Sequence, residues 1–191
     1  MREIETLALV IVGVLRSSLG SVGVMLLLAW TGNLQAQVPS FQQLQLPPPS
    51  DGGPNIQEFV TGGAGSLQGF AGLATILNGS PVILYDPAWL QWMGGPASSN
   101  FRFTRAHEYA HHRLGHAFQQ YYAPPHVLPM LGYQSELEAD CAAVRVLTQS
   151  GDQLAVGAGF SIYQQVLPAQ DMHGRPGAAA RLQNMQACLH Y

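Results

Sequence analysis

The sequence predicts an α+β fold that is mainly helical, with a small sheet beside the helix that carries the candidate functional residues. A continuous apolar run at residues 80–87 is typical of a strand. Helical patterns follow it at residues 100–115, 135–149 and 178–188. Residues 56–78 mix apolar residues with many glycines, and this part has no clear assignment. One strand followed by helices therefore favours an α+β domain.

The boundaries of the strand and of the first helix follow from local signals. Pro81 and Pro87 bound the apolar run, which limits it to a short strand. A polar loop comes next, and the helix after it is expected to be capped by Asn100 or Thr104. This helix should continue to about Gly115, because glycine commonly ends a helix.

Two further helices are expected in the C-terminal half. Residues 123–133 contain several prolines and predict an irregular connection. The helix at residues 135–149 then ends before Gly151. The loop at residues 167–177 precedes the last helix, residues 178–188.

The first part of the chain resembles an export signal. Residues 1–36 contain apolar runs at 7–15 and 19–30, separated by Arg16, and Ala36 follows at a site of small residues that suits cleavage. The alternative is an uncleaved anchor that combines both runs. In either case the remainder is expected to be periplasmic or secreted, with membrane contact only if the segment is retained.

The rest of the chain divides into a Pro/Gln-rich linker, residues 37–56, and one domain, residues 57–191. The chain contains no lysine and only 8 basic residues, and its net charge is −3. This composition argues against nucleic-acid binding. Cys141 and Cys188 could form a disulfide or remain as two buried thiols, and the sequence does not decide between them.

The segment HEYAHHRLGH, residues 107–116, contains the pattern H-E-x-x-H. On a helix, His107 and His111 lie on one face, so that both imidazoles can bind one metal ion. Glu108 can then reach a water on that metal as a general base. A polar helix surface in a His-rich chain is the alternative, so the motif needs a third ligand.

The same segment does not supply that third ligand. The metzincin pattern requires glycine and histidine where this chain has Leu114 and Ala117. His112 and His116 lie on a different face from the motif histidines, which places them at the surface or behind the ligands.

The segment SELEAD offers the missing ligand from a separate helix. Glu136 would complete a His₂Glu site, and Asp140, one turn later on the same face, would accept the outer N–H of a ligating histidine. Ser135 and Glu138 also have the spacing of a capping box, so these acids could simply begin a helix.

H-E-x-x-H followed by E-x-x-A-D resembles the gluzincin metallopeptidases of the HtpX and CAAX-prenyl-protease group. The flanking segments VILYDPAWL and RPGAAARLQNMQAC are also similar to that group, and the resemblance covers roughly residues 75–190. The two motifs are similar as well to the small bacterial neutral zinc peptidases. The multi-pass membrane helices of the namesake enzymes are absent from the sequence, which implies a soluble or singly anchored relative.

The resemblance implies a zincin-like fold and one zinc ion per chain. His107, His111 and Glu136 would bind the metal, Glu108 would act as the base, and Asp140 would support a ligand. The chain would then be an exported zinc endopeptidase that hydrolyses peptide bonds of protein or peptide substrates by a zinc-activated water, with cell-envelope protein quality control as one expected role. The alternative is a non-catalytic zinc-binding module of the same fold.

Two details of this expectation concern substrate and transition state. The group usually has a His-Pro pair whose histidine stabilises the oxyanion, but this chain has Arg175 before Pro176. His173 is favoured for that role over Arg175 or Arg181. The strand PVILYD is expected to be the edge strand that receives an extended substrate.

Overall fold

The structure is a computed structural model, and it describes residues 40–49, 54–67, 69–168, 170–171 and 175–189. All of these belong to the unit formed by residues 37–191. The expected signal or anchor at residues 1–36 lies outside the described residues. Within the described ranges, no helix is both long and apolar enough to cross a membrane.

The described strands form one four-stranded sheet in the order β1-β2-β4-β3. The strands are β1 (Phe41–Gln43), β2 (Gln57–Thr61), β3 (Gly72–Leu77) and β4 (Ser80–Tyr85). The β2–β4 pair is parallel, and the other two pairs are antiparallel. The predicted strand is confirmed as β4, but its expected position at the sheet edge is wrong. Both β2 and β3 come from the stretch left unassigned, and they flank β4.

The interior position of β4 agrees with its composition. Val82, Ile83, Leu84 and Tyr85 are all buried, so both faces of the strand are covered. Continuous apolar runs are typical of strands buried on both faces. Asp86 follows as the helix cap, accepting from Ala88 N and Trp89 N, and ends the strand.

The arm before β2 also belongs to the sheet. β1 falls inside the segment expected to be a linker and pairs with β2 at the edge opposite β3. Leu44 N donates to Glu58 O at 2.8 Å, and Arg105 donates to the carbonyl of Pro47 at 2.7 Å. These bonds hold the arm against the domain.

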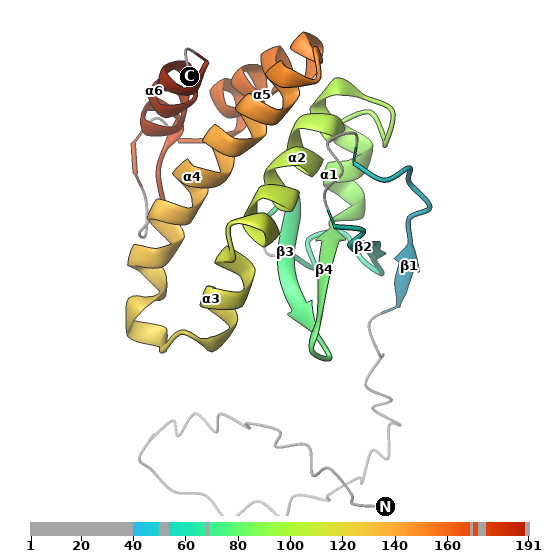
Figure 1. Ribbon diagram of the computed structural model, residues 1–191. Helices are drawn as coiled ribbons and strands as arrows, with labels where there is room; N and C mark the ends of the chain where they lie inside the picture. The colour runs from blue at the N-terminus through green and yellow to red at the C-terminus, as the bar shows by residue number, and fades with distance from the viewer. Residues whose placement is uncertain (1–39, 50–53, 68, 169, 172–174, 190–191) are drawn as a thin grey trace, which may run out of the picture. The chain divides into compact units, whose positions relative to one another are not determined.

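Helices pack beside this sheet (Figure 1). They are α1 (Pro87–Trp92), α2 (Ser99–Arg113), α3 (His116–Tyr122), the 3₁₀ turn η1 (Pro125–Val127), α4 (Leu128–Gln149), α5 (Gln153–Val166) and α6 (Ala178–Cys188). Helix α2 contacts β3 on one side and both α4 and α5 on the other. The described part is thus α+β, mainly helical, with a small sheet beside α2, as the sequence predicts.

Two predicted helix starts are wrong. Ser98, not Asn100 or Thr104, caps α2, and its hydroxyl accepts from Phe101 N at 3.1 Å. The correct cap lies in the serine-rich loop just upstream, where three polar residues offered similar signals. Thr104 instead donates to the Asn100 carbonyl at 3.1 Å inside the helix.

Helix α4 begins at Leu128, about two turns earlier than predicted. Proline is compatible with a first helical turn, so Pro129 opens this helix rather than preventing it. Ser135 is therefore mid-helical, and its hydroxyl donates to the Gly132 carbonyl at 3.1 Å. The capping-box alternative for Ser135 and Glu138 is excluded.

The last two helices differ in how far the sequence predicted them. Helix α6 matches the predicted residues 178–188. Helix α5 was not predicted, although Asp152 caps it by accepting from Ala155 N at 3.1 Å. Phe103 from α2, Val144 from α4 and Met185 from α6 share one core cluster with α5. This core fixes the helices around α2.

Candidate metal centre

The H-E-x-x-H residues lie in the second half of α2, where the helix is buried between the sheet and α4. His107, Glu108 and His111 are each less than 10% exposed. The Nε2 atoms of His107 and His111 are 3.0 Å apart. The one-turn spacing of the motif therefore directs both rings toward a common point.

Helix α4 adds Glu136 to this point. Its Oε2 lies 3.4 Å from His107 Nε2, and its Oε1 lies 3.9 Å from His111 Nε2. One ligand atom from each of the three residues lies within 4.8 Å of the others. Zinc binds imidazole and carboxylate at about 2.0–2.2 Å, so ligands that share one ion lie about 3–4 Å apart. The donor types and their convergence fit a divalent metal such as zinc.

Close packing of α4 against α2 permits this convergence. Ala139 and Ala143 are fully buried, one and two turns beyond Glu136. Small side chains let two helix backbones approach, whereas larger ones would hold Glu136 away from the histidines.

Asp140 supports His107 from behind. Its Oδ1 lies 2.9 Å from His107 Nδ1, a close contact whose angle is poor for a hydrogen bond. Burial by itself would lower the pKa of His107, but Asp140 and Glu136 outweigh it and raise that pKa to about 10 in the metal-free protein. Asp140 therefore lies beside His107, which is the position that the sequence predicts for it.

Arg181 joins the two carboxylates of α4. Its Nη1 lies 2.9 Å from Glu136 Oε2, while Nε and Nη2 each donate to Asp140 at 2.7 Å. Tyr163 of α5 also donates to Asp140 Oδ1 at 2.6 Å, and the Arg181 guanidinium lies over its ring. Although burial raises carboxylate pKa values, His107 and Arg181 hold the pKa of Glu136 well below its usual range. The guanidinium of Arg181 is thus engaged in ion pairs with Glu136 and Asp140.

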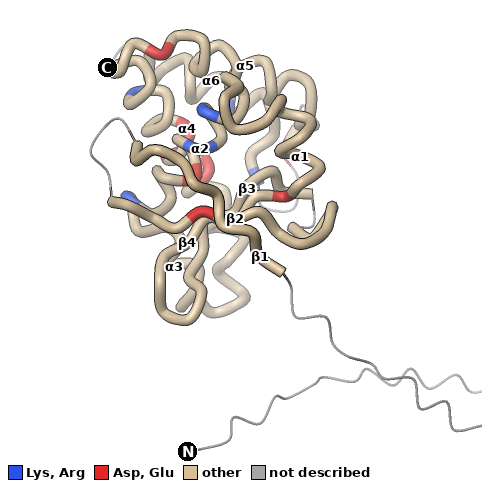
Figure 2. Tube along the Cα trace, turned by 90° about the vertical axis from the view of Figure 1, so that its right-hand side faces the viewer, with Lys and Arg blue, Asp and Glu red and all other residues tan. Residues whose placement is uncertain are grey.

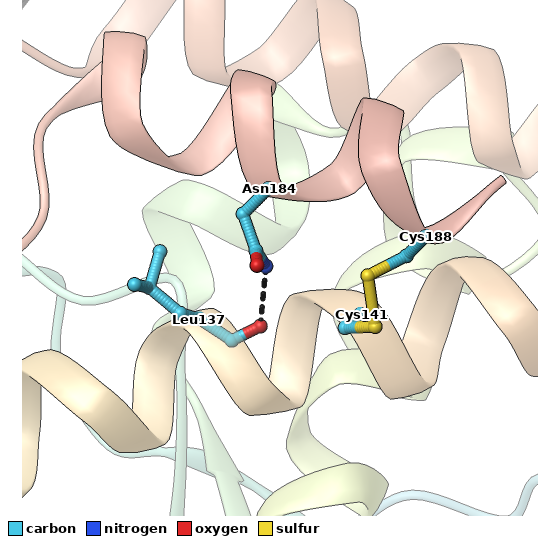
Figure 3. Close-up of a disulfide and its surroundings, with 4 residues drawn as sticks. All are labelled: Leu137, Cys141, Asn184 and Cys188. Atoms are coloured by element: carbon cyan, nitrogen blue, oxygen red, sulfur yellow. Dashed lines mark hydrogen bonds between the residues drawn. A yellow bond between two sulfur atoms is a disulfide. The ribbon is translucent and has the colours of Figure 1, made fainter. Parts of the chain in front are cut away.

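The position of Arg181 depends on how α6 is attached to α4 (Figure 3). Cys141 and Cys188 form a disulfide, which resolves the alternative left open by the sequence. One turn away, Asn184 donates to the Leu137 carbonyl at 2.6 Å. These two links hold α6 along α4, and Arg181 lies on the same helix.

In Figure 2, acidic and basic positions gather around α2 and α4, whereas the α3 end carries almost no charge.

Glu108 lies beside the three ligand candidates and contacts the edge strand β3. Its Oε2 accepts from Ala74 N at 2.8 Å. Gly72 leaves the necessary space, because a Cβ there would lie 2.7 Å from Glu108 Oε1. Burial raises the pKa of Glu108 to about 7. The carboxylate is therefore held in place and can exchange a proton near neutral pH.

The two remaining histidines of the motif segment do not face the ligand atoms. His112 Nε2 lies 2.9 Å from the Val82 carbonyl on β4. His116 is buried behind His111, with its Nδ1 3.2 Å from His111 Nδ1 and its Nε2 2.9 Å from Glu138. His112 thus lies against the sheet, and His116 lies behind a candidate ligand.

A cavity of about 320 Å³ opens over the cluster. Its polar wall is formed by His107, Glu108, His111 and Glu136 together with Arg175 and Arg181. Apolar side chains from α1, its C-terminal cap and α5 line much of the rest, among them Trp89, Trp92, Met93, Ile162 and Val166. The candidate metal-binding side chains are therefore accessible from the cavity to a molecule of moderate size.

Of the three residues considered for the oxyanion, His173 lies outside the described residues. Arg181 is engaged by Asp140, Tyr163 and Glu136. Arg175 borders the cavity, with its guanidinium 3.9 Å above the ring of Phe70.

Sequence reasoning missed several residues that shape this site. Tyr163 belongs to the unpredicted helix α5, and Gly72 and Ala74 belong to the unassigned glycine-rich stretch. The only local signal was the E-x-x-A-D spacing, which identified Asp140 but gave no information about its distant partners. Long-range contacts of this kind leave no pattern in neighbouring residues.

Comparisons of this chain with known families, with curated proteins and with solved structures gave no match. Functional proposals for it therefore rest on the motifs and on the geometry described above.

Proposed function

We propose that this chain is an exported zinc-dependent endopeptidase with a zincin-like fold. The observation that carries the proposal is the convergence of the buried His107 and His111 with the half-buried Glu136 beside Glu108, in the lining of a cavity. Two histidines one turn apart, a carboxylate from a second helix and a separate buried carboxylate form the set that metal-assisted peptide hydrolysis requires.

The proposed ligands are His107, His111 and Glu136, with Asp140 supporting His107. Three protein ligands leave a further coordination position open, which is typical of catalytic rather than structural zinc sites. When bound, zinc would lower the pKa of a coordinated water and polarise the substrate carbonyl.

Glu108 is the proposed general base. A carboxylate with a pKa of about 7 can take a proton at neutral pH and return it to the leaving amine. The Ala74 N–H fixes Oε2, and Gly72 provides room for Oε1. Glu108 is not among the three converging ligand candidates, so it remains available for proton transfer.

The edge strand β3 is the proposed guide for the substrate backbone, in place of the strand expected from the sequence. The N–H of Ala74 bonds Glu108 and therefore points away from β4, toward the free edge. Alternate residues share that direction in an antiparallel strand, so Gly72 and Ile76 also direct backbone groups outward. An extended peptide would add to this edge by main-chain hydrogen bonds.

Arg175 is the proposed group for the developing oxyanion. It borders the cavity and stays cationic, whereas Arg181 is held by Asp140 and Glu136. A positive group at the place where negative charge develops stabilises the transition state more than the ground state.

Export is supported by the disulfide between Cys141 and Cys188, since such bonds persist mainly outside the cytoplasm. Export would place the activity in the envelope or outside the cell, where removal of damaged proteins is a suitable role. The unfolded state of a damaged protein offers the extended segments that an edge strand binds.

The test combines metal content with cleavage of an unfolded protein such as casein. The purified protein should contain one zinc per chain, and Glu136→Ala should lose most of it. Glu108→Gln should keep the zinc and lower the cleavage rate by at least about 100-fold, the usual contribution of a general base. His126→Ala is the matched control, because His126 is exposed on η1 and should change neither property.

Each failure has a distinct meaning. Wild-type protein that binds zinc but cleaves nothing would support the non-catalytic zinc-binding module instead. Cleavage that survives Glu108→Gln would reject Glu108 as the base. A folded wild-type protein without zinc affinity would reject the metal centre altogether.

A further inference from the structure

His116 occupies a position that the proposed catalytic steps do not use. It is 3% exposed, although histidine is a polar residue, and both of its ring nitrogens have partners. One partner is Nδ1 of His111, and the other is a carboxylate oxygen of Glu138. His116 therefore lies between a candidate metal ligand and an acid at the protein surface.

The backbone places His116 there through the turn between α2 and α3. Helix α2 ends at Arg113, and Gly115 adopts φ 77°, in the left-handed region that glycine favours. Helix α3 begins directly after this glycine, and its first residue, His116, faces His111 of α2. The rings of His111 and His116 lie 5.3 Å apart between centroids, tilted by 70°.

The partners of His116 determine where its proton lies. An ionised carboxylate only accepts hydrogen bonds, so Nε2 of His116, 2.9 Å from Glu138 Oε2, must carry a hydrogen. A neutral His116 then presents an unprotonated Nδ1 to His111. Gln134 donates to the other Glu138 oxygen at 2.7 Å and helps to hold this acceptor in place.

The same logic then fixes the tautomer of His111. Two unprotonated nitrogens at 3.2 Å would repel each other, so His111 Nδ1 must carry the hydrogen that lies between the rings. His111 Nε2 is left unprotonated, and in the metal-free protein its lone pair faces His107 Nε2 at 3.0 Å, close to Glu136.

We infer that His116 is a positioning residue which, together with Glu138, holds His111 in the Nδ1–H tautomer required for metal binding through Nε2. The inference rests on the proposed function for its purpose, but the tautomer is a property of the chain itself. His116 thus lies beside Nδ1 of His111, as Asp140 lies beside Nδ1 of His107. Such outer partners commonly change metal affinity 10–100-fold.

The test begins with the metal-free wild-type protein labelled with ¹⁵N-histidine. Nuclear magnetic resonance should detect a coupling across an N–H···N bond between His111 and His116, with the hydrogen on His111 Nδ1. A hydrogen on His116 Nδ1, or no such coupling, would overturn the inference. This measurement needs neither zinc nor activity, so it stands even if the chain proves not to be a peptidase.

Zinc affinity, measured by competition with a chelator, provides the second test. His116→Phe removes both nitrogens and should weaken zinc binding 10–100-fold. His116→Gln keeps an acceptor oxygen and should recover most of that loss. His112→Phe is the matched control: it is adjacent to His111, contacts β4 instead, and should bind zinc as the wild type does.

Wild-type affinity in a folded His116→Phe protein would contradict a positioning role. If His116→Phe does not fold, the wild-type resonance experiment still decides the question. If the wild type shows the expected hydrogen on His111 but binds no zinc, the proposed metal centre fails while the assigned tautomer holds.

Discussion

The Arg181 guanidinium lies 2.9 Å from Glu136 and contributes positive charge that allows the buried Asp140 and the half-buried Glu136 to remain ionised one turn apart on α4. Both Arg181 and Asp140 are almost completely buried. Removing one member of a buried ion pair costs much more than the pair itself contributes, because the partner's charge is left uncompensated.

Arg181→Met should therefore destabilise the fold by about 3–5 kcal/mol. Urea denaturation of the wild type and the variant measures this difference. Arg102→Met is the control, because the Arg102–Asp152 pair is 38% and 24% exposed and should contribute no more than about 1 kcal/mol. Equal effects of the two substitutions would show that the Arg181 network is not a special determinant of stability.

Gly72→Ala should reduce catalysis without removing the metal ligands. The added Cβ would lie 2.7 Å from Glu108 Oε1, so the carboxylate must move away from its position. Displacing a catalytic group by about 1 Å commonly lowers the rate about 100-fold. Measurement of kcat/KM together with zinc content checks this expectation. Gly63→Ala, where a Cβ meets nothing within 4 Å, should leave both unchanged.

Reduction of the Cys141–Cys188 disulfide should destabilise the fold by about 4 kcal/mol on the loop-entropy account, given a sequence separation of 47. Thermal unfolding with and without a reductant measures the effect. The double variant Cys141→Ala/Cys188→Ala should unfold at the lower temperature in both conditions. A reductant effect that persists in the double variant would mean that another process is responsible.

The Arg102–Asp152 pair should make part of the stability depend on pH. A hydrogen bond from Arg102 lowers the pKa of Asp152, so the folded state binds its proton less readily than the unfolded state does. The contribution is present above the unfolded pKa of about 3.9 and disappears as the pH falls through the lower folded value. Urea denaturation between pH 6 and pH 2 should therefore show a smaller acid-induced loss for Asp152→Asn, which keeps a capping side chain. An identical pH profile would exclude this pair as a source of acid sensitivity.

The convergence of the candidate site residues could be predicted because the sequence patterns that indicate it are local. His107, Glu108 and His111 follow from spacing within one helix, and Glu136 and Asp140 follow from a second short pattern. Helical periodicity places the residues of each pattern on one face of their helix. Small residues between α2 and α4 allow these two faces to pack together. The structure brings these five residues together without requiring any correction.

The surroundings of the site could not be predicted because they depend on distant contacts. The edge strand β3 is rich in small residues and has no alternating pattern, and only its pairing with β4 makes it a strand. Helix α5 contains glycines that weaken a helix prediction, yet Gly159 is required where a Cβ would lie 2.3 Å from Phe103. Tertiary packing overrides local propensity at both places.

The free edge of β3 also has a consequence for the proteins on which such an enzyme would act. A strand that pairs with its substrate can receive only a segment whose own backbone hydrogen bonds are open. For a folded target, the cleavage rate would then follow the equilibrium fraction in which that segment is locally unfolded, rather than the chemistry of the scissile bond. The enzyme would distinguish its targets by their conformational stability, and a marginally stable protein would be cleaved before a robust one of the same sequence at the cut site.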